Sequence, residues 1–219
     1  MAQQIALRRR EQVAEGTLAF HFDKPAGFSY QAGQNALFSL QESHTFTIAS
    51  APHEPELMIA TRMRDSAFKR ALGALPVGAS MRLDGPAGLM TLHEDAARPA
   101  VFLAGGIGIT PFVSMVRDAK ARRLSHSITL FYSNRRPEHA AFLNEFSEIK
   151  LVATMTEAPG WSGETRRISR ELLAEHVPDL QAPVYYFAGP PGMTMAVQGM
   201  LGELGVRDED MRSEEFYGY

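Results

Sequence analysis

The chain has 219 residues, of which 45% are hydrophobic and 21% are charged, and its formal net charge at pH 7 is -3. These values are ordinary for a folded globular protein, and they exclude a disordered chain, a collagen-like chain and a disulfide scaffold. The small negative charge provides no basic surface, so we expect no nucleic-acid partner and no binding to an anionic membrane.

The sequence contains no cysteine. Structural disulfides, thiol nucleophiles and a cysteine-bound iron–sulfur cluster on this chain are therefore excluded, and redox chemistry would need a bound organic cofactor. The seven histidines are scattered without metal-ligand spacing, so we expect no metal site. No apolar stretch follows the arginines near the N-terminus, and glycines and a proline split the longest apolar run. We expect a cytoplasmic protein without integral membrane association.

The first hundred residues contain short, alternating or apolar segments separated by turn signals such as "KPAG" and "APHEPE". This pattern predicts antiparallel strands. One helix is predicted over 65–75, with Asp65 or Ser66 as its cap. Residues 1–97 are therefore predicted to form a small antiparallel β-barrel. The predicted strands cover 4–13, 17–22, 34–40, 44–50, 56–63, 80–85 and 89–92.

From Pro99 onward, apolar segments alternate with amphipathic segments. This alternation predicts a parallel sheet covered by helices, so residues 98–219 are predicted to form an α/β domain that binds ligands at the carboxyl ends of its strands. The predicted strands cover 99–105, 127–134, 150–156 and 184–190. The predicted helices cover 111–123, 137–149, 169–177 and 193–205.

Two turns at strand ends are rich in glycine and proline. The segment "GGIGITP" (105–111) follows one predicted strand, and "AGPPGM" (188–193) includes the end of another. Glycine lets backbone N–H groups approach a phosphate group at a helix N-terminus, although the same glycines could simply allow tight packing. Because carboxyl ends of parallel strands share one edge of a sheet, the two turns are predicted to form a slot.

The segment "LFYSNRRPEH" places Ser133, Arg135 and Arg136 at the end of a further strand. Arginine suits the 2′-phosphate of NADP, whereas the free ribose hydroxyl of NAD usually receives an acidic side chain. These residues favour NADPH over NADH. The alternative is two solvated arginines in a loop.

In the first half, "HTFT" (44–47) and "GPAG" (85–88) would by themselves indicate only a strand and a turn. In this order, with both glycine turns and the final "EEFYGY", the chain resembles the ferredoxin–NADP reductase family. The resemblance extends over essentially the whole sequence. It implies a flavin-binding barrel followed by a nucleotide-binding domain, and an oxidoreductase that takes hydride from NAD(P)H and passes electrons to a separate acceptor.

The resemblance also implies the residues that bind the flavin. His44 stands where the family has arginine for the flavin phosphate, and Phe46 stands where it has tyrosine against the ring. Thr47 keeps the hydroxyl that the family directs at flavin N5, which makes it a candidate catalytic residue. The implied flavin-binding set is His44, Thr45, Phe46, Thr47, Arg62, Ser66, Gly85 and Gly88.

For the nucleotide, the resemblance implies contacts from the turns, the arginine segment and the tail. The implied set is Gly106, Gly108, Thr110, Pro111, Ser133, Arg135, Arg136, Gly189, Pro190, Pro191, Met193 and Phe216. Ala188 replaces a cysteine that assists hydride transfer in some members. The tail offers Glu214 or Glu215 as a proton relay and Phe216, Tyr217 or Tyr219 as a covering aromatic ring; Glu215 and Tyr219 are the catalytic candidates.

The implied cofactors are FAD, with FMN as an alternative, and NADPH, with NADH as an alternative. The implied partner is a redox protein such as ferredoxin, flavodoxin or an oxygenase component. Two other functions stay open at this point. One is a ferric-chelate or quinone reductase, and the other is a non-catalytic nucleotide-binding subunit, which the altered "HTFT" segment allows.

Overall fold

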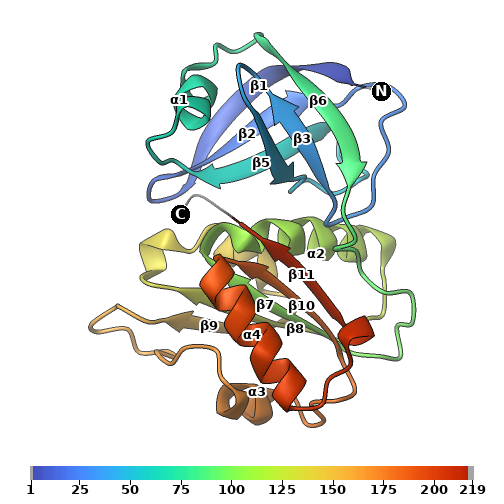
Figure 1. The fold of residues 1–219 in the computed structure, drawn as a ribbon, viewed down its shortest axis with the longest axis vertical. Coiled ribbons are helices and arrows are strands. Elements are labelled where there is room, and N and C mark those ends of the chain that lie inside the picture. Colours follow the sequence, from blue (N-terminus) through green and yellow to red (C-terminus); the bar gives the residue numbers. More distant parts are fainter. Residues whose placement is uncertain (1, 217–219) are drawn as a thin grey trace. The chain divides into compact units, whose positions relative to one another are not determined.

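A computed structural model describes residues 2–216, and these residues form two compact units (Figure 1). The barrel unit comprises residues 2–91 and 110–121, and the sheet unit comprises 92–109 and 122–216. The boundary predicted after residue 97 stays a prediction. Within residues 2–216, no helix has both the length and the apolar character needed to cross a membrane.

The barrel unit contains six antiparallel strands in the order β4-β3-β6-β1-β2-β5, as predicted for the first half. Their alternating residues enclose a core of Phe20, Phe22, Phe38 and Ile59, and helix α1 (Ala67–Ala74) buries Phe68 and Leu72 against it. Ser66 caps α1 by accepting a hydrogen bond from the backbone N–H of Lys69 at 3.2 Å. The strands are β1 (Gln3–Ala14), β2 (Thr17–Asp23), β3 (Asn35–Ser39), β4 (Ser43–Thr47), β5 (Glu56–Arg62) and β6 (Ser80–Ala87).

Helix α2 (Thr110–Arg122) packs within the barrel unit. The Ser114 hydroxyl donates to the Ser50 carbonyl at 2.6 Å, and Arg117 pairs with Glu54 at 3.2 Å. Gly33 allows this packing, because a Cβ atom there would lie 2.4 Å from the Met115 methyl carbon. The helix that follows the first glycine turn is thus anchored on the barrel.

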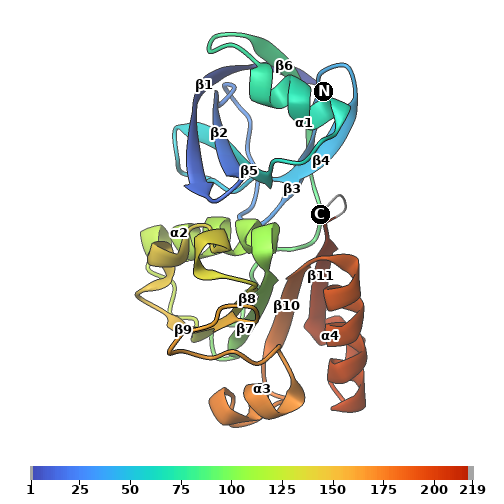
Figure 2. The ribbon, with the colours of Figure 1, turned by 90° about the vertical axis from the view of Figure 1, so that its left-hand side faces the viewer.

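The sheet unit contains five parallel strands in the order β11-β10-β7-β8-β9 (Figure 2). The chain moves from β7 to β8 and β9 on one side and from β10 to β11 on the other, so the order of the strands reverses between β7 and β10. Such a switch point is where doubly wound sheets bind ligands. The strands are β7 (Ala100–Gly105), β8 (Ile128–Asn134), β9 (Lys150–Met155), β10 (Val184–Gly189) and β11 (Met211–Glu215).

Helices α3 (Arg170–His176) and α4 (Pro191–Glu203) cover one face of this sheet. Leu172, Leu173, Val197 and Leu201 pack there against buried strand residues that include Phe131. The short 3-10 turns are η1 (Gly106–Ile109), η2 (Pro137–His139), η3 (Leu143–Phe146) and η4 (Asp208–Asp210).

Three sequence-based predictions differ from the structure. The helix predicted over 137–149 is wrong: the segment forms η2 and η3, with Phe142 between them in the left-handed region at φ 59°. Continuous helix cannot pass through that conformation. Residues 89–92 form no strand, and β11 was not predicted because its sequence, "MRSEE", has little apolar character.

Arg98 ties together the amino ends of three strands. Its guanidinium group donates to the carbonyl groups of Ala182 and Pro183, just before β10, and to Asp210 at 2.7 Å, just before β11. The hydrogen bond from Arg98 lowers the pKa of the Asp210 carboxyl below 3.8, against the opposing effect of burial. This cluster lies at the edge of the sheet opposite the glycine turns.

We expect Asp210→Asn to weaken the fold in a pH-dependent way. Because the folded-state pKa is depressed, the carboxylate stabilises the fold above its ordinary pKa of 3.8, and this contribution is lost as pH falls through the folded-state value. Urea unfolding at pH 5 should show the variant to be less stable by about 1–3 kcal/mol. The difference should shrink at pH 3; a constant difference would contradict this account.

Candidate functional site

The two glycine turns touch each other through their backbones. A Cβ atom at Gly108 would lie 2.2 Å from the carbonyl oxygen of Ala188, and one at Gly189 would lie 3.2 Å from the Gly105 Cα atom. Gly106 has a left-handed backbone, with φ 53°. Tight packing therefore explains Gly108 and Gly189, whereas Gly106 is required by the shape of the turn. Gly106, Gly108 and Gly189 therefore lie together at the edge of the sheet where the sequence predicts a slot.

Helix α4 begins at this edge. Pro190 is its cap residue and Pro191 its first residue, and the N–H groups of Met193 and Thr194 bond to the Pro190 carbonyl group. A Cβ atom at Gly192 would meet nothing within 4 Å, so the first turn of α4 opens onto free space. Pro191 has no N–H group, so the Gly192 N–H group and the helix dipole are what this N-terminus offers to an anion.

The tail returns to the same edge on β11. Glu215 lies opposite Gly189 in the parallel register, and the N–H group of Phe216 donates to the Gly189 carbonyl at 3.0 Å. The Thr194 hydroxyl lies 3.3 Å from Glu215 Oε1, within donating distance of the carboxylate. Glu215 and Phe216 are therefore brought to the second turn, whereas Tyr219 lies outside the described residues.

The end of β8 adds a polar cluster. Ser133 lies opposite Gly105 in the register and accepts a hydrogen bond from Thr154 at 3.3 Å. Arg135 pairs with Glu157 at 3.6 Å, and Arg136 contacts the His139 ring at 3.0 Å. The predicted residues Ser133, Arg135 and Arg136 thus lie at the carboxyl end of β8. Sequence reasoning missed Glu157, whose only signal was its position just after the next strand.

Thr110 and Pro111 follow the first turn directly and begin α2. Both are buried, and α2 belongs to the barrel unit. Pro111 suits a first-turn position because its ring presets the helical φ and its missing N–H group is not needed there.

In the barrel unit, β4 presents two rings on one face. His44 and Phe46 lie opposite Phe38 and Ala36 of β3, so they share the core face. The His44 and Phe68 ring centroids are 4.4 Å apart, and those of Phe46 and Phe68 are 5.6 Å apart. Thr45 and Thr47 lie on the other face; Thr45 is exposed and Thr47 is 2% exposed.

The Lys69 ammonium group lies where β5 ends and α1 begins. The Lys69 ammonium group donates to the Arg62 carbonyl at 2.9 Å, and Ser66 caps the same helix. Burial lowers the pKa of Lys69, and the charge of Arg64 lowers it further. The structure brings the predicted residues Arg62 and Ser66 together and adds Lys69, which sequence reasoning missed although it is the third residue after the cap. Positive charges at a helix N-terminus form an anion site.

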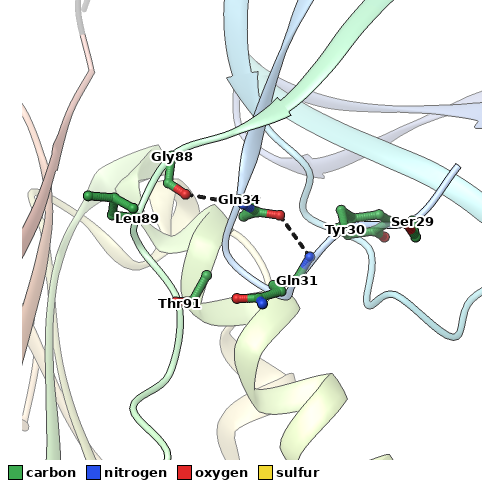
Figure 3. A pocket seen from close by; sticks show the side chains of 7 residues that line it. All are labelled: Ser29, Tyr30, Gln31, Gln34, Gly88, Leu89 and Thr91. Carbon is green, nitrogen blue, oxygen red and sulfur yellow. Dashed lines mark hydrogen bonds between the residues drawn. The ribbon is translucent and has the colours of Figure 1, made fainter. Parts of the chain in front are cut away.

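Gly85 and Gly88 flank the end of β6. A Cβ atom at Gly85 would lie 2.8 Å from the Ala36 Cβ atom, and Gly88 has a left-handed backbone. A pocket of about 540 Å³ lies beside Gly88 (Figure 3). There the Gln34 side chain donates to the Gly88 carbonyl at 3.2 Å. Gly88 is the only predicted site residue in the lining, which consists of Ser29, Tyr30, Gln31, Gln34, Gly88, Leu89 and Thr91.

We expect Gly108→Ala to destabilise the fold, because its Cβ atom would collide with the Ala188 backbone, which has no freedom to move away. The expected loss is about 1–3 kcal/mol. Gly199→Ala is the matched control: Gly199 lies exposed on α4 with open space around it, and the change should stabilise by about 0.5–1 kcal/mol. Urea unfolding compares the two variants, and equal effects would contradict the close contact between the turns.

Sequence comparison finds known proteins that are similar to this chain. Residues 102–199 match the family model of the oxidoreductase NAD-binding domain. A ferredoxin–NADP reductase B of Sorangium cellulosum is 28% identical over 225 residues, covering 91% of this chain and 90% of the relative. The ferredoxin–NAD(P)+ reductase component of naphthalene 1,2-dioxygenase/salicylate 5-hydroxylase systems from a Ralstonia species is 24% identical, covering 89% of this chain and 62% of the relative.

The chain spans about three fifths of the length of several curated relatives, with coverages of 62%, 59% and 59%. Among solved structures, a ferredoxin NADP+ reductase from Neisseria gonorrhoeae with bound FAD and NADP has a TM-score of 0.85 at 18% identity and covers 98% of both chains. The ferredoxin reductase in carbazole 1,9a-dioxygenase has a TM-score of 0.88 at 20% identity, covering 99% of this chain and 70% of the other. These likenesses establish the fold, an antiparallel β-barrel followed by an α/β domain with a parallel sheet.

Proposed function

We propose that the chain, which is similar to ferredoxin–NADP reductases and to reductase components of oxygenase systems, is a flavin-dependent oxidoreductase that takes a hydride from NAD(P)H and passes electrons to a separate acceptor. The observation that carries this proposal is the meeting of two glycine turns at the switch point of an all-parallel sheet. The altered "HTFT" segment also allows a second function, that of a non-catalytic nucleotide-binding subunit. An anaerobic titration with nucleotide distinguishes this function from that of a reductase.

The residues at the sheet edge fit a dinucleotide. Gly106 shapes the first turn, the N-terminus of α4 opens at Gly192, and Arg135 supplies a cation at the end of β8. Backbone N–H groups would bind the diphosphate without requiring a charged side chain. Pro190, Pro191 and Met193 would line the second turn, with Met193 packed toward Gly105.

The residues of the barrel unit fit a flavin. Ser66, Arg62 and Lys69 would hold its phosphate at the start of α1, together with the His44 ring on the neighbouring strand. Phe46 would pack against the ring system and Thr47 would donate a hydrogen bond to it. A bound flavin supplies the change from two-electron to one-electron transfer. FAD and FMN both fit this phosphate site, and we propose FAD because the likeness to FAD-containing reductases extends over the whole chain.

Glu215 would hold a proton near the second turn. Its carboxylate is exposed, lies beside Gly189 and accepts from Thr194, so it combines access to solvent with a fixed position. Phe216, held at Gly189 by its backbone, would cover a bound ring. The same covering role is proposed for Tyr219.

We propose that the electron acceptor is an oxygenase component or a ferredoxin. Several relatives are named as reductase components of dioxygenase or monooxygenase systems. The present sequence contains no cysteine, so a cysteine-bound cluster would have to come from another polypeptide or from outside this sequence.

Anaerobic absorbance titration tests the proposed reaction. Purified protein is reconstituted with FAD and titrated with NADPH and, separately, NADH. We expect the band of the bound flavin near ~450 nm to bleach with one equivalent of nucleotide, because a two-electron donor reduces one flavin. A protein that retains no flavin, or whose flavin is not bleached by either nucleotide, would contradict the proposal and favour the non-catalytic nucleotide-binding subunit.

We further propose a preference for NADPH that depends on Arg135. Arg135 pairs with Glu157, but both side chains are more than half exposed, and such a pair stabilises little. A 2′-phosphate, which bears more charge and offers bidentate geometry, would replace the carboxylate.

Arg135→Ala should lower kcat/KM for NADPH by roughly 10-fold or more, the loss expected for one charge-assisted hydrogen bond, and leave kcat/KM for NADH nearly unchanged. Steady-state kinetics with both nucleotides measures the ratio. Arg170→Ala on the exposed start of α3 is the control for a lost surface charge and should change neither value. Equal losses for both nucleotides in Arg135→Ala would contradict the assigned preference.

A further inference from the structure

Asn134 is a buried residue whose side-chain amide has no hydrogen-bond partner within residues 2–216. It is 5% exposed, and both Oδ1 and Nδ2 lack a partner. A buried primary amide normally forms several hydrogen bonds, so an amide with none is unusual in a folded protein. None of the sequence motifs pointed to it.

The backbone of Asn134 is firmly held, which makes the unpaired amide a built feature of the site. Its carbonyl group accepts from the Thr156 N–H group at 2.9 Å, and Asn134 pairs with Met155 in the β8–β9 register. The polar neighbours Ser133 and Arg135 have partners in Thr154 and Glu157. Of the three consecutive side chains of Ser133, Asn134 and Arg135, only that of Asn134 has no partner within the part of the chain that the structure describes.

Its position is at the carboxyl edge next to the first glycine turn. Ser133 lies opposite Gly105 in the register, so Asn134 is level with Gly106, where the turn begins. Asn134 shares a strand face with Tyr132 rather than with Ser133, because side chains alternate. The Tyr132 hydroxyl donates to the Ala141 carbonyl on that face. Asn134 therefore lies at the carboxyl end of β8, next to Arg135 and level with the start of the first glycine turn.

We propose that the Asn134 side chain binds the ribose on the adenosine side of the nucleotide. Both a donor and an acceptor are unpaired, and a ribose hydroxyl supplies the complementary acceptor and donor in one group. A phosphate oxygen would satisfy only the Nδ2 donor. This inference rests on the proposed function, since it assigns a further positioning residue within the same nucleotide site.

A binding role and a structural role differ in their effects on stability. If Asn134 serves the nucleotide, the free protein carries an unpaired buried amide, and Asn134→Leu, which has a similar volume, should leave Tm unchanged or raise it. If Asn134 serves the fold, the same change should lower Tm. Asn134→Ala provides a second variant that fits the site even where leucine does not.

Isothermal titration calorimetry of the flavin-loaded protein with ADP and with NADP+ measures binding without turnover, and a thermal scan without nucleotide gives Tm. We expect both variants to bind ADP and NADP+ about 10-fold more weakly, the loss typical of one or two neutral hydrogen bonds. Gln3→Leu is the matched control. It removes another buried, unpaired amide oxygen, on β1 of the barrel unit, and should leave both affinities unchanged.

Wild-type affinity in both Asn134 variants would overturn the inference. A lower Tm in both variants would overturn it as well, whether or not binding weakens, because a structural role would then explain the result. Failure of the wild-type protein to bind either ligand would instead refute the proposed function itself. Weaker binding with an unchanged or raised Tm supports the assignment.

Discussion

The arrangement of this protein depends on one backbone contact, between the turn that ends β7 and the turn that ends β10. Gly108 lies against the Ala188 carbonyl group with no room for a side chain, and Gly189 lies against Gly105, where a Cβ atom would be tight. This contact fixes the two central strands of the sheet at their carboxyl ends. It also directs the N-terminus of α4 and the tail residues Glu215 and Phe216 to the same edge, so one packing constraint brings together most of the proposed nucleotide site.

The proposed flavin site depends on different donors. At the sheet edge backbone N–H groups would be the main donors, whereas at the start of α1 the Lys69 ammonium group donates to the Arg62 carbonyl beside the Ser66 cap. His44 takes the position of an arginine on β4 and packs its ring on Phe68. In the proposed flavin site, the Lys69 ammonium group would be the cation held at the start of α1.

The sequence indicated both halves of the fold because their periodicities differ and their turns carry glycine and proline at fixed places. The glycine turns, Ser133 and Arg135 were found because strand ends mark them in the sequence. The prediction of a helix over 137–149 was wrong because Phe142 has a left-handed backbone, which the apolar pattern does not indicate. Strand β11 was missed because its pairing with β10, and not an apolar pattern, holds it. Asn134 had no sequence signal, since a lost partner is visible only in three dimensions.

The central claim is that both glycine turns bind one dinucleotide. Its most direct test is a titration of the isotope-labelled, flavin-loaded protein with NADP+, followed through the backbone amide resonances by NMR. The account predicts that the resonances of Gly106, Gly108, Gly189 and Gly192 shift together along a single binding curve. Shifts confined to one turn, or the largest shifts at the opposite edge of the sheet around Arg98, would contradict it.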